Sequence, residues 1–392
     1  MSKPVLKNNR VLRSQQVLKA LIAVLRPYLP LDLQNTRITA EDILAVLSYA
    51  SVHRISMDAA CNELKEAPSG NRLREVLAQA LPDRKVLQRA LNTILRAQTP
   101  RFVKKGKRAY YIAIDLTLIP YHGEQYAHEN EIVRSQPKSG TTHFHGYATV
   151  SIVHDNQRFV VALRFVEKGE SMEKIVAWLL NRLKSIGISI KRAYFDKGFC
   201  SVPVLKTLER RKIKFIMPMP VRGKSGGVRT LFEASASHKT TYTFHSPKHG
   251  ELKVSAVVVK KYSKARYKRK GARWFAYAAA GLPKSVKPHQ VFEMYRQRFG
   301  IETSYRQMNQ VRARTTSRNP VIRLLLVGLA FILFNLYIAN RQHFTICLKN
   351  PAKPFSKFWL TLRRLTHMLA HAVEDLFDLA DVVSRHARVA LS

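Results

Sequence analysis

Acidic residues are scarce in this chain of 392 residues. Only 26 Asp and Glu stand against 67 Lys and Arg, so the formal net charge is +41. Self-repulsion at that charge favours a polyanionic partner, and nucleic acid is the commonest one. The charge does not say what happens to the nucleic acid. Passive binding to ribosomal RNA or to an anionic membrane stays open as an alternative.

Cysteine is equally rare: Cys61, Cys200 and Cys347 lie far apart, and no CxxC pair occurs. This spacing argues against a disulfide framework and against a thiolate zinc site. The N-terminal segment also lacks the apolar run of a secretory signal. We therefore expect a protein of the reducing cytoplasm.

Long hydrophobic runs are almost missing. The exception is residues 324–339, which include Gly328 and Asn335 and are flanked by Arg323 and Arg341. Sixteen residues are short for a bilayer span. We predict a buried core helix and no membrane association; a membrane-spanning helix is the alternative.

Residues 1–100 are predicted to form a helical DNA-binding region. Within residues 56–81, two short amphipathic segments flank the breaker Ala-Pro-Ser-Gly. Ser56 can cap the first helix, and Ser69 or Asn71 can cap the second. The pair resembles a helix-turn-helix, in which Arg72 and Arg74 at the start of the second helix would contact DNA. An ordinary helical hairpin is the alternative.

The pattern changes to period two after residue 105, which indicates strands. Three strands are followed by a helix, a strand, a second helix and a further strand. The first strands can form a meander, whereas the later ones need helical crossovers and so run parallel. This is the element order of the ribonuclease H-like α/β fold, a mixed sheet with flanking helices. We assign residues 105–219 and 286–345 to this domain.

Residues 220–285 interrupt that order as a β-rich insertion. Two predicted strands flank residues 260–273, in which eight of fourteen residues are basic and none is acidic. Such a run is usually a solvated tip, but beside nucleic acid Lys268, Arg269 and Lys270 would contact phosphates. A basic helix is expected from Pro288 to about Ser317, and residues 346–392 form a C-terminal helical region.

Three carboxylates stand out against this basic background. Asp115 lies within the apolar strand Tyr-Tyr-Ile-Ala-Ile-Asp-Leu-Thr-Leu-Ile, where an acid is costly unless it is paired or binds a cation. Asp196 follows a short buried strand, where a turn aspartate is also common. Glu302 is a lone acid in a basic helix; pairing with Arg298 or Arg306 would contribute only about 0.3–0.5 kcal/mol.

Carboxylates from two strand ends and one helix can converge in this fold. Their hard oxygens suit Mg²⁺ or Mn²⁺. Two such ions about 3.5–4 Å apart activate a water or a 3′-hydroxyl and stabilise the leaving oxygen in phosphoryl transfer. The lone acid would then hold metal while the arginines around it hold phosphates.

The segments Ala-Ile-Asp-Leu-Thr, Tyr-Phe-Asp-Lys-Gly-Phe and Tyr-Arg-Gln-Arg-Phe-Gly-Ile-Glu resemble the three carboxylate motifs of DDE transposases from prokaryotic insertion sequences. Tyr295, Arg298 and Glu302 match the first three positions of the signature Y-(2)-R-(3)-E-(6)-K. Asn309 stands where that family has lysine, so Arg312 or Arg314 would have to take over its contact with DNA.

The resemblance implies the roles of these residues. By analogy with the family, Asp115, Asp196 and Glu302 would bind two Mg²⁺ or Mn²⁺ ions. Tyr295 and Arg298 would position DNA phosphates near the cut. It also implies double-stranded DNA as partner, both as terminal inverted repeats and as target, and a homodimer that pairs two ends.

We therefore predict a prokaryotic DNA transposase that cleaves the ends of its insertion sequence and joins the 3′-hydroxyl ends to target DNA. Two alternatives stay open: a metal-dependent endonuclease with the same core, and a non-catalytic DNA-binding protein derived from a transposase. A zinc pair at His143 and His145 lacks a firm third ligand in the sequence.

Overall fold

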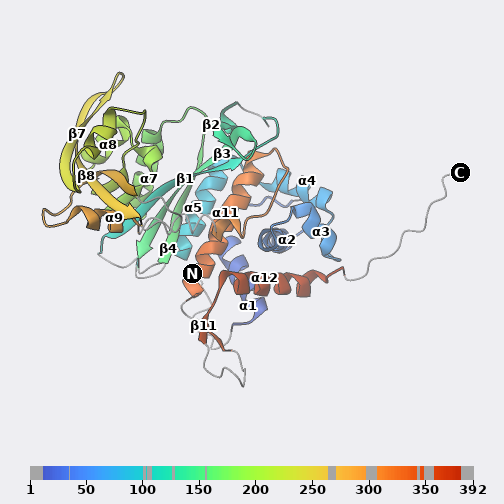
Figure 1. Cartoon of the computed structure of the whole chain (residues 1–392). Coiled ribbons are helices and arrows are strands. Elements are labelled where there is room, and N and C mark those ends of the chain that lie inside the picture. Colours follow the sequence, from blue (N-terminus) through green and yellow to red (C-terminus); the bar gives the residue numbers. More distant parts are fainter. Residues whose placement is uncertain are drawn as a thin grey trace. The chain divides into compact units, whose positions relative to one another are not determined.

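The structure is a computed structural model that describes residues 12–34, 36–99, 103, 108–125, 129–154, 157–263, 271–296, 307–341, 345–347 and 357–380. The chain forms two compact units, coloured by sequence in Figure 1. The helical unit comprises Met1–Gln98 and Gln307–Ser392, and the sheet unit comprises Thr99–Arg306. The expected catalytic domain is thus divided: residues 286–306 lie in the sheet unit, and the rest of 286–345 lies in the helical unit.

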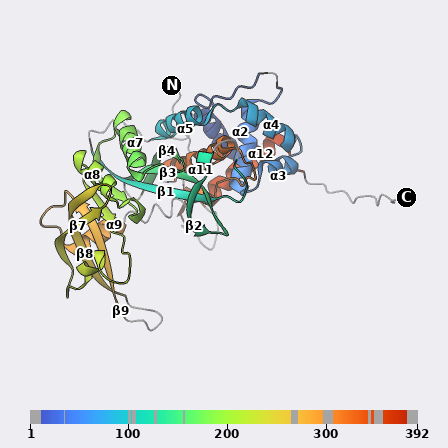
Figure 2. The same cartoon turned by 90° about the horizontal axis from the view of Figure 1, so that it is seen from above.

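The sheet unit is built on one nine-stranded mixed sheet, seen from a second direction in Figure 2. Its strand order is β2-β3-β1-β5-β6-β9-β8-β7, and β4 also pairs with β3. The strands are β1 (Tyr110–Pro120), β2 (Val133–Lys138), β3 (Thr141–His154), β4 (Gln157–Val166), β5 (Ile190–Phe195), β6 (Phe215–Pro218), β7 (His238–Ser246), β8 (Gly250–Ser263) and β9 (Gly271–Ala280).

The crossover helices have the positions that the sequence predicts. Helix α7 (Met172–Ser185) begins after Ser171, whose hydroxyl accepts a hydrogen bond from the Lys174 amide, and it leads to β5. Helix α8 (Val202–Arg210) leads from β5 to β6. Strands β1, β5 and β6 consequently run parallel, as expected for helical crossovers. The short strand β2 is an addition to the predicted order.

The β-rich insertion continues the central sheet. Strand β9 pairs antiparallel with β6, from Phe215–Ala280 to Pro218–Tyr277, and β8 and β7 follow outward. Strand β7 was not predicted, although its run of threonine and aromatic residues before a turn at Gly250 is typical of a hairpin strand. The insertion therefore lengthens the sheet on which the predicted active site is built.

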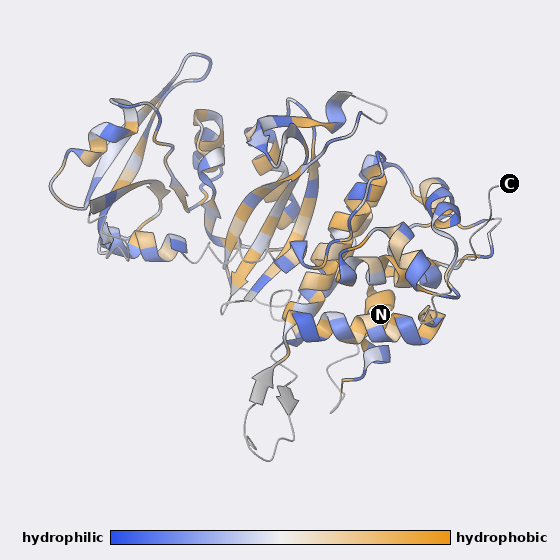
Figure 3. Cartoon of the chain, turned by 45° about the vertical axis from the view of Figure 1, so that its right-hand side comes forward, coloured by the Kyte–Doolittle hydropathy of each residue, from blue (hydrophilic) through white to orange (hydrophobic). Residues whose placement is uncertain are grey.

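Helix α9 (Pro288–Arg296) packs on this extended sheet. Its Val291 and Tyr295 join a buried cluster with residues of six strands, among them Ala113, Tyr194 and Tyr277. The rings of Tyr277 and Tyr295 lie 5.2 Å apart. Tyr277, which is 3% exposed, is thus a core residue. The hydropathy colouring of Figure 3 shows the apolar central strands that form this core.

The basic helix that begins at Pro288 does not reach Ser317, so this part of the prediction is wrong. Residues 312–319 are not helical. The Thr315 hydroxyl accepts a hydrogen bond from the Ser317 amide, and the Ser317 hydroxyl accepts one from the Asn319 amide. Such local bonds compete with helical ones, and Pro320 then starts the next helix.

The apolar run lies in α11 (Pro320–Asn340), which packs on α5 (Arg84–Gln98) in the helical unit. The helix is long and apolar enough to cross a membrane, but 94% of its most apolar 18-residue window is buried inside the protein. A Cβ at Gly328 would lie 2.6 Å from Leu91, so the two helices approach closely. This burial agrees with the predicted core helix.

The remaining helices surround this pair in the helical unit. They are α1 (Ser14–Leu25), α2 (Ala40–His53), α3 (Met57–Glu63), α4 (Gly70–Ala80) and α12 (Leu362–Phe377). Helices α3 and α4 are the two short helices predicted within residues 56–81. Ser56 and Ser69 cap them, as the sequence suggested. A Cβ at Gly70 would lie 2.8 Å from the Asp58 Cα, so their close approach requires glycine.

Candidate active site

Asp115 and Asp196 lie side by side on neighbouring parallel strands. Ala113 of β1 pairs with Tyr194 of β5, and Ile114 pairs with Phe195. The next residue in each segment is an aspartate: Asp115 lies within β1, and Asp196 directly follows β5. The backbone of Asp196 stays extended, with φ −76° and ψ 160°. Neighbouring strands are about 4.8 Å apart, so the register places the main chains of the two aspartates next to each other.

Both aspartates share the face of the sheet on which α9 packs. Side chains alternate along a strand, so Asp115 lies on the face of Ala113, and Asp196 on the face of Tyr194. Ala113 and Tyr194 belong to the buried cluster that includes Val291 and Tyr295 of α9. Along each strand, the acid therefore comes two residues after a core residue. The last turn of α9 approaches the sheet at this place.

Asp115 is the more constrained of the two acids. Asp115 is 7% exposed, and its Oδ1 accepts a hydrogen bond of 2.9 Å from the Leu116 amide. Asp196 is half-buried and precedes the single 3-10 turn Lys197–Phe199, in which the Phe199 amide donates to the Asp196 carbonyl at 3.1 Å. Asp196 thus lies at the end of β5, whereas Asp115 lies within β1, which continues to Pro120 and stays paired with β3.

Two side chains tie α9 to β5. The Tyr295 hydroxyl donates a hydrogen bond of 3.1 Å to the Phe195 carbonyl, and Tyr295 is 4% exposed. The buried Arg192 donates to the Gly281 carbonyl at 3.1 Å and lies 3.5 Å from the Met294 sulfur. Sequence reasoning missed Arg192. The alternation of side chains along β5 could have indicated it, because it places Arg192 on the same face as Tyr194 and Asp196.

The donor chemistry of this strand edge fits a hard divalent cation. Asp115 and Asp196 offer carboxylate oxygens, the ligands that Mg²⁺ and Mn²⁺ prefer. In the described part of the chain, no three His, Cys, Asp and Glu side chains gather into a metal-binding group. The third predicted ligand, Glu302, lies outside the described residues, as do Arg298, Lys268, Arg269 and Lys270. His143 and His145 acquire no third ligand among the residues with described positions.

The other predicted DNA-binding residues lie in the helical unit. Arg72 and Arg74 are exposed on α4: Arg72 lies 3.5 Å from Glu75, and Arg74 lies 3.6 Å from Asp58. Asn309 is exposed, and its Oδ1 accepts a hydrogen bond of 3.4 Å from Arg312 Nε. Position 309, the lysine position of the signature, is therefore adjacent to a cation.

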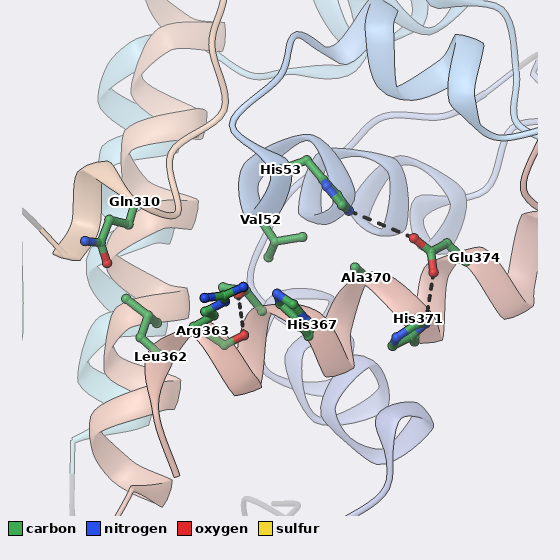
Figure 4. A pocket seen from close by; sticks show the side chains of 10 residues that line it. Val52, His53, Gln310, Leu362, Arg363, His367, Ala370, His371 and Glu374 are labelled. Carbon is green, nitrogen blue, oxygen red and sulfur yellow. Dashed lines mark hydrogen bonds and ion pairs between the residues drawn. The ribbon is translucent and has the colours of Figure 1, made fainter.

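A cavity of about 530 Å³ lies elsewhere in the helical unit, beside α12 (Figure 4). Glu374 Oε2 lies 3.1 Å from His371 Nδ1, and Glu374 Oε1 lies 4.0 Å from His53 Nε2. The Tyr49 hydroxyl donates to Glu63 at 3.2 Å and to Glu374 at 3.4 Å. Burial and the two carboxylates raise the pKa of Tyr49 above its ordinary value. These polar groups satisfy one another, so we assign the cavity no ligand.

The family model for the transposase DDE domain matches residues 107–336, which is more than half of the chain. The chain belongs to the DDE transposase family. It is a DNA transposase, an enzyme that cleaves and transfers DNA, and it binds DNA. Enzymes of this family generally use divalent metal ions. No curated protein matches the chain.

A solved structure supports the same fold for this transposase. The cryo-EM structure of a piggyBac transposase synaptic complex with hairpin DNA matches with a TM-score of 0.57 and 12% sequence identity. The match covers 95% of this chain and 83% of that chain. At this identity the likeness concerns the fold, and it confirms the predicted ribonuclease H-like class with its mixed sheet and flanking helices.

Proposed function

We propose that this transposase cleaves DNA at the ends of its own insertion sequence and joins the 3′-hydroxyl ends to target DNA at one metal site. Asp115, Asp196 and Glu302 are the proposed metal ligands. The observation that supports this most strongly is the strand register: both aspartates follow the same hydrogen-bonded pair and share one face of the sheet.

The chain's own residues hold and orient the metal site. Asp115 is fixed by its strand and by the Leu116 amide, so its second oxygen has a defined direction. Asp196 is fixed by the strand end that Tyr295 contacts. Two bound Mg²⁺ or Mn²⁺ ions would activate the attacking oxygen and neutralise charge on the leaving one. Glu302 lies seven residues after Tyr295, a length of chain that spans at most about 25 Å.

The cations of the chain are proposed to hold the DNA around this site. Arg298, Lys268, Arg269 and Lys270 would contact phosphates near the cut. Arg72 and Arg74 on α4 would help to recognise the terminal inverted repeats, and Asn309 with Arg312 would contact the end DNA in place of the family lysine. The net charge of +41 supports such a wide set of phosphate contacts.

Pairing of two transposon ends would require at least a homodimer in the synaptic complex. The scarcity of cysteine supports a reducing cytoplasm as the place of action. The resemblance to transposases of insertion sequences supports a prokaryotic host.

The test is cleavage of a duplex that contains the terminal inverted repeat, with wild type and Glu302→Gln, in Mg²⁺ and in EDTA. We expect cutting by the wild type in Mg²⁺ alone and no cutting by the variant, with DNA binding retained by both. Equal cutting by both proteins would refute Glu302 as a ligand. A second assay with a pre-cut end separates a transposase of this mechanism, which joins the end to target DNA, from a nuclease, which does not.

A further inference from the structure

Tyr295 is a buried residue whose hydroxyl reaches the strand end of β5. It is 4% exposed, and its hydroxyl donates to the Phe195 carbonyl at 3.1 Å. That carbonyl belongs to the peptide unit that joins Phe195 to Asp196. The bond therefore orients the peptide from which the Asp196 side chain extends, and it does so from the last turn of α9.

The rest of α9 is held independently of this bond. Glu293 pairs with Lys261 of β8 at 2.7 Å, and the Lys261 ammonium lies 3.7 Å from the centre of the Phe292 ring. Phe292 also packs edge-on against Phe275 of β9, with ring centres 5.0 Å apart. The helix is thus clamped to the insertion strands. Loss of the Tyr295 hydroxyl would leave α9 in place and affect the Phe195–Asp196 peptide.

We propose that Tyr295 is a positioning residue, which fixes the peptide of Asp196 and so acts on metal affinity rather than on DNA affinity. This inference rests on the proposed function, because it takes Asp196 as a metal ligand. It differs from the phosphate contact that the family signature implies for this tyrosine, since that contact requires a hydroxyl that faces DNA.

The test compares Tyr295→Phe with Tyr277→Phe. Both remove one hydroxyl from the same buried cluster and leave the ring, but only the Tyr295 hydroxyl has the bond to Phe195. Mn²⁺ binding is measured without DNA, from the electron paramagnetic resonance signal of free Mn²⁺. Affinity for the terminal-repeat duplex is measured in EDTA by fluorescence anisotropy.

We expect Tyr295→Phe to weaken Mn²⁺ binding by about three- to tenfold, the size of one net hydrogen bond, with DNA affinity unchanged. Tyr277→Phe should match the wild type in both assays. Replacement of Tyr295 by p-aminophenylalanine, which restores a donor, should recover Mn²⁺ affinity. Thermal unfolding of each variant checks that the fold is kept.

Three results would overturn the inference. Weaker DNA binding with unchanged Mn²⁺ affinity would identify a phosphate contact. Wild-type behaviour of Tyr295→Phe in both assays would show that the bond has no role. Failure of the p-amino donor to restore Mn²⁺ affinity would show that the loss is not due to hydrogen bonding. If Asp196→Asn bound Mn²⁺ as the wild type does, the proposed metal site itself would fail, which is a separate outcome.

Discussion

The sheet unit and the helical unit present their functional side chains in opposite ways. Asp115 is 7% exposed and fixed by strand register, whereas the side chains of Arg72 and Arg74 are 51% and 49% exposed near the start of a short helix. A metal site needs ligands held within about 0.5 Å, while phosphate contacts tolerate more movement. Main-chain hydrogen bonds therefore position the predicted metal ligands, whereas exposed cations supply the predicted DNA contacts.

The largest effect is expected at the two aspartates of the candidate active site. Asp196→Asn keeps the shape of the side chain but removes its charge, so cleavage should fall at least about a thousandfold, or about 4 kcal/mol in the barrier. The matched control is Glu233→Gln, an exposed carboxylate of the same unit, which should cut normally. Single-turnover cleavage of the terminal-repeat duplex measures both, and comparable rates would remove Asp196 from the site.

The helical unit should be most sensitive where its short helices touch. Gly70→Ala places a Cβ 2.8 Å from the Asp58 Cα and should lower the free energy of unfolding by about 1–3 kcal/mol. Gly198→Ala is the control, because its Cβ would meet no atom within 4 Å. Urea unfolding followed by circular dichroism gives the values. An unchanged midpoint for Gly70→Ala would mean that α3 and α4 are not closely packed.

Alkaline pH should weaken both units through their buried thiols. Burial raises the pKa of Cys61 to about 11 and that of Cys200 to about 12. A raised pKa in the folded state means stability that is complete below the unfolded-state pKa, near 8.5, and is lost as pH rises toward 11–12. Each thiol contributes a loss of up to about 1.4 kcal/mol per pH unit in that window.

Unfolding in urea at pH 8, 9 and 10 tests this loss. Cys61→Ala and Cys200→Ala should each flatten the pH dependence relative to the wild type. If the free energy of unfolding fell with pH as steeply in both variants as in the wild type, the thiols would not be the source of the alkaline loss of stability.

The smallest effect is expected at the exposed arginines. Removal of one phosphate contact by Arg72→Ala should reduce the slope of log affinity against log salt concentration by about 0.9. Arg26→Ala is the control, because Arg26 is an exposed arginine of the same unit that pairs with Glu41 at 2.6 Å. Anisotropy titrations over a range of salt concentrations measure the slope. An identical slope for Arg72→Ala and the wild type would place the DNA elsewhere.

Local patterns were enough to predict the centre of the sheet unit. The alternation of apolar and polar residues around Asp115 and the short apolar run before Asp196 predicted the two strands. The helical crossovers between them predicted that they run parallel. The sequence predicted that the two acids converge but not the strand register that brings them together, because the pairing of Ile114 with Phe195 joins distant segments.

The features that the sequence did not predict have physical causes. Strand β2 is polar, contains Pro137 and lies at an edge, so it has no alternating pattern to detect. The end of the basic helix before Ser317 depends on hydroxyl contacts that propensity alone does not reveal. The division of the chain at Arg306 arises because α11 packs on α5, more than 200 residues earlier in the sequence.

The most direct test of the shared metal site is replacement of each aspartate by cysteine. Asp115→Cys and Asp196→Cys substitute a softer ligand, which Mn²⁺ accepts better than Mg²⁺ does. Of the three native thiols, Cys61 and Cys200 are buried with raised pKa values and will not compete. Cys347 is replaced by serine in both variants. We expect both variants to lose cleavage of the terminal-repeat duplex in Mg²⁺ and to regain part of it in Mn²⁺. Equal activity in the two metals, for either variant, would contradict the account that these two aspartates hold one metal site.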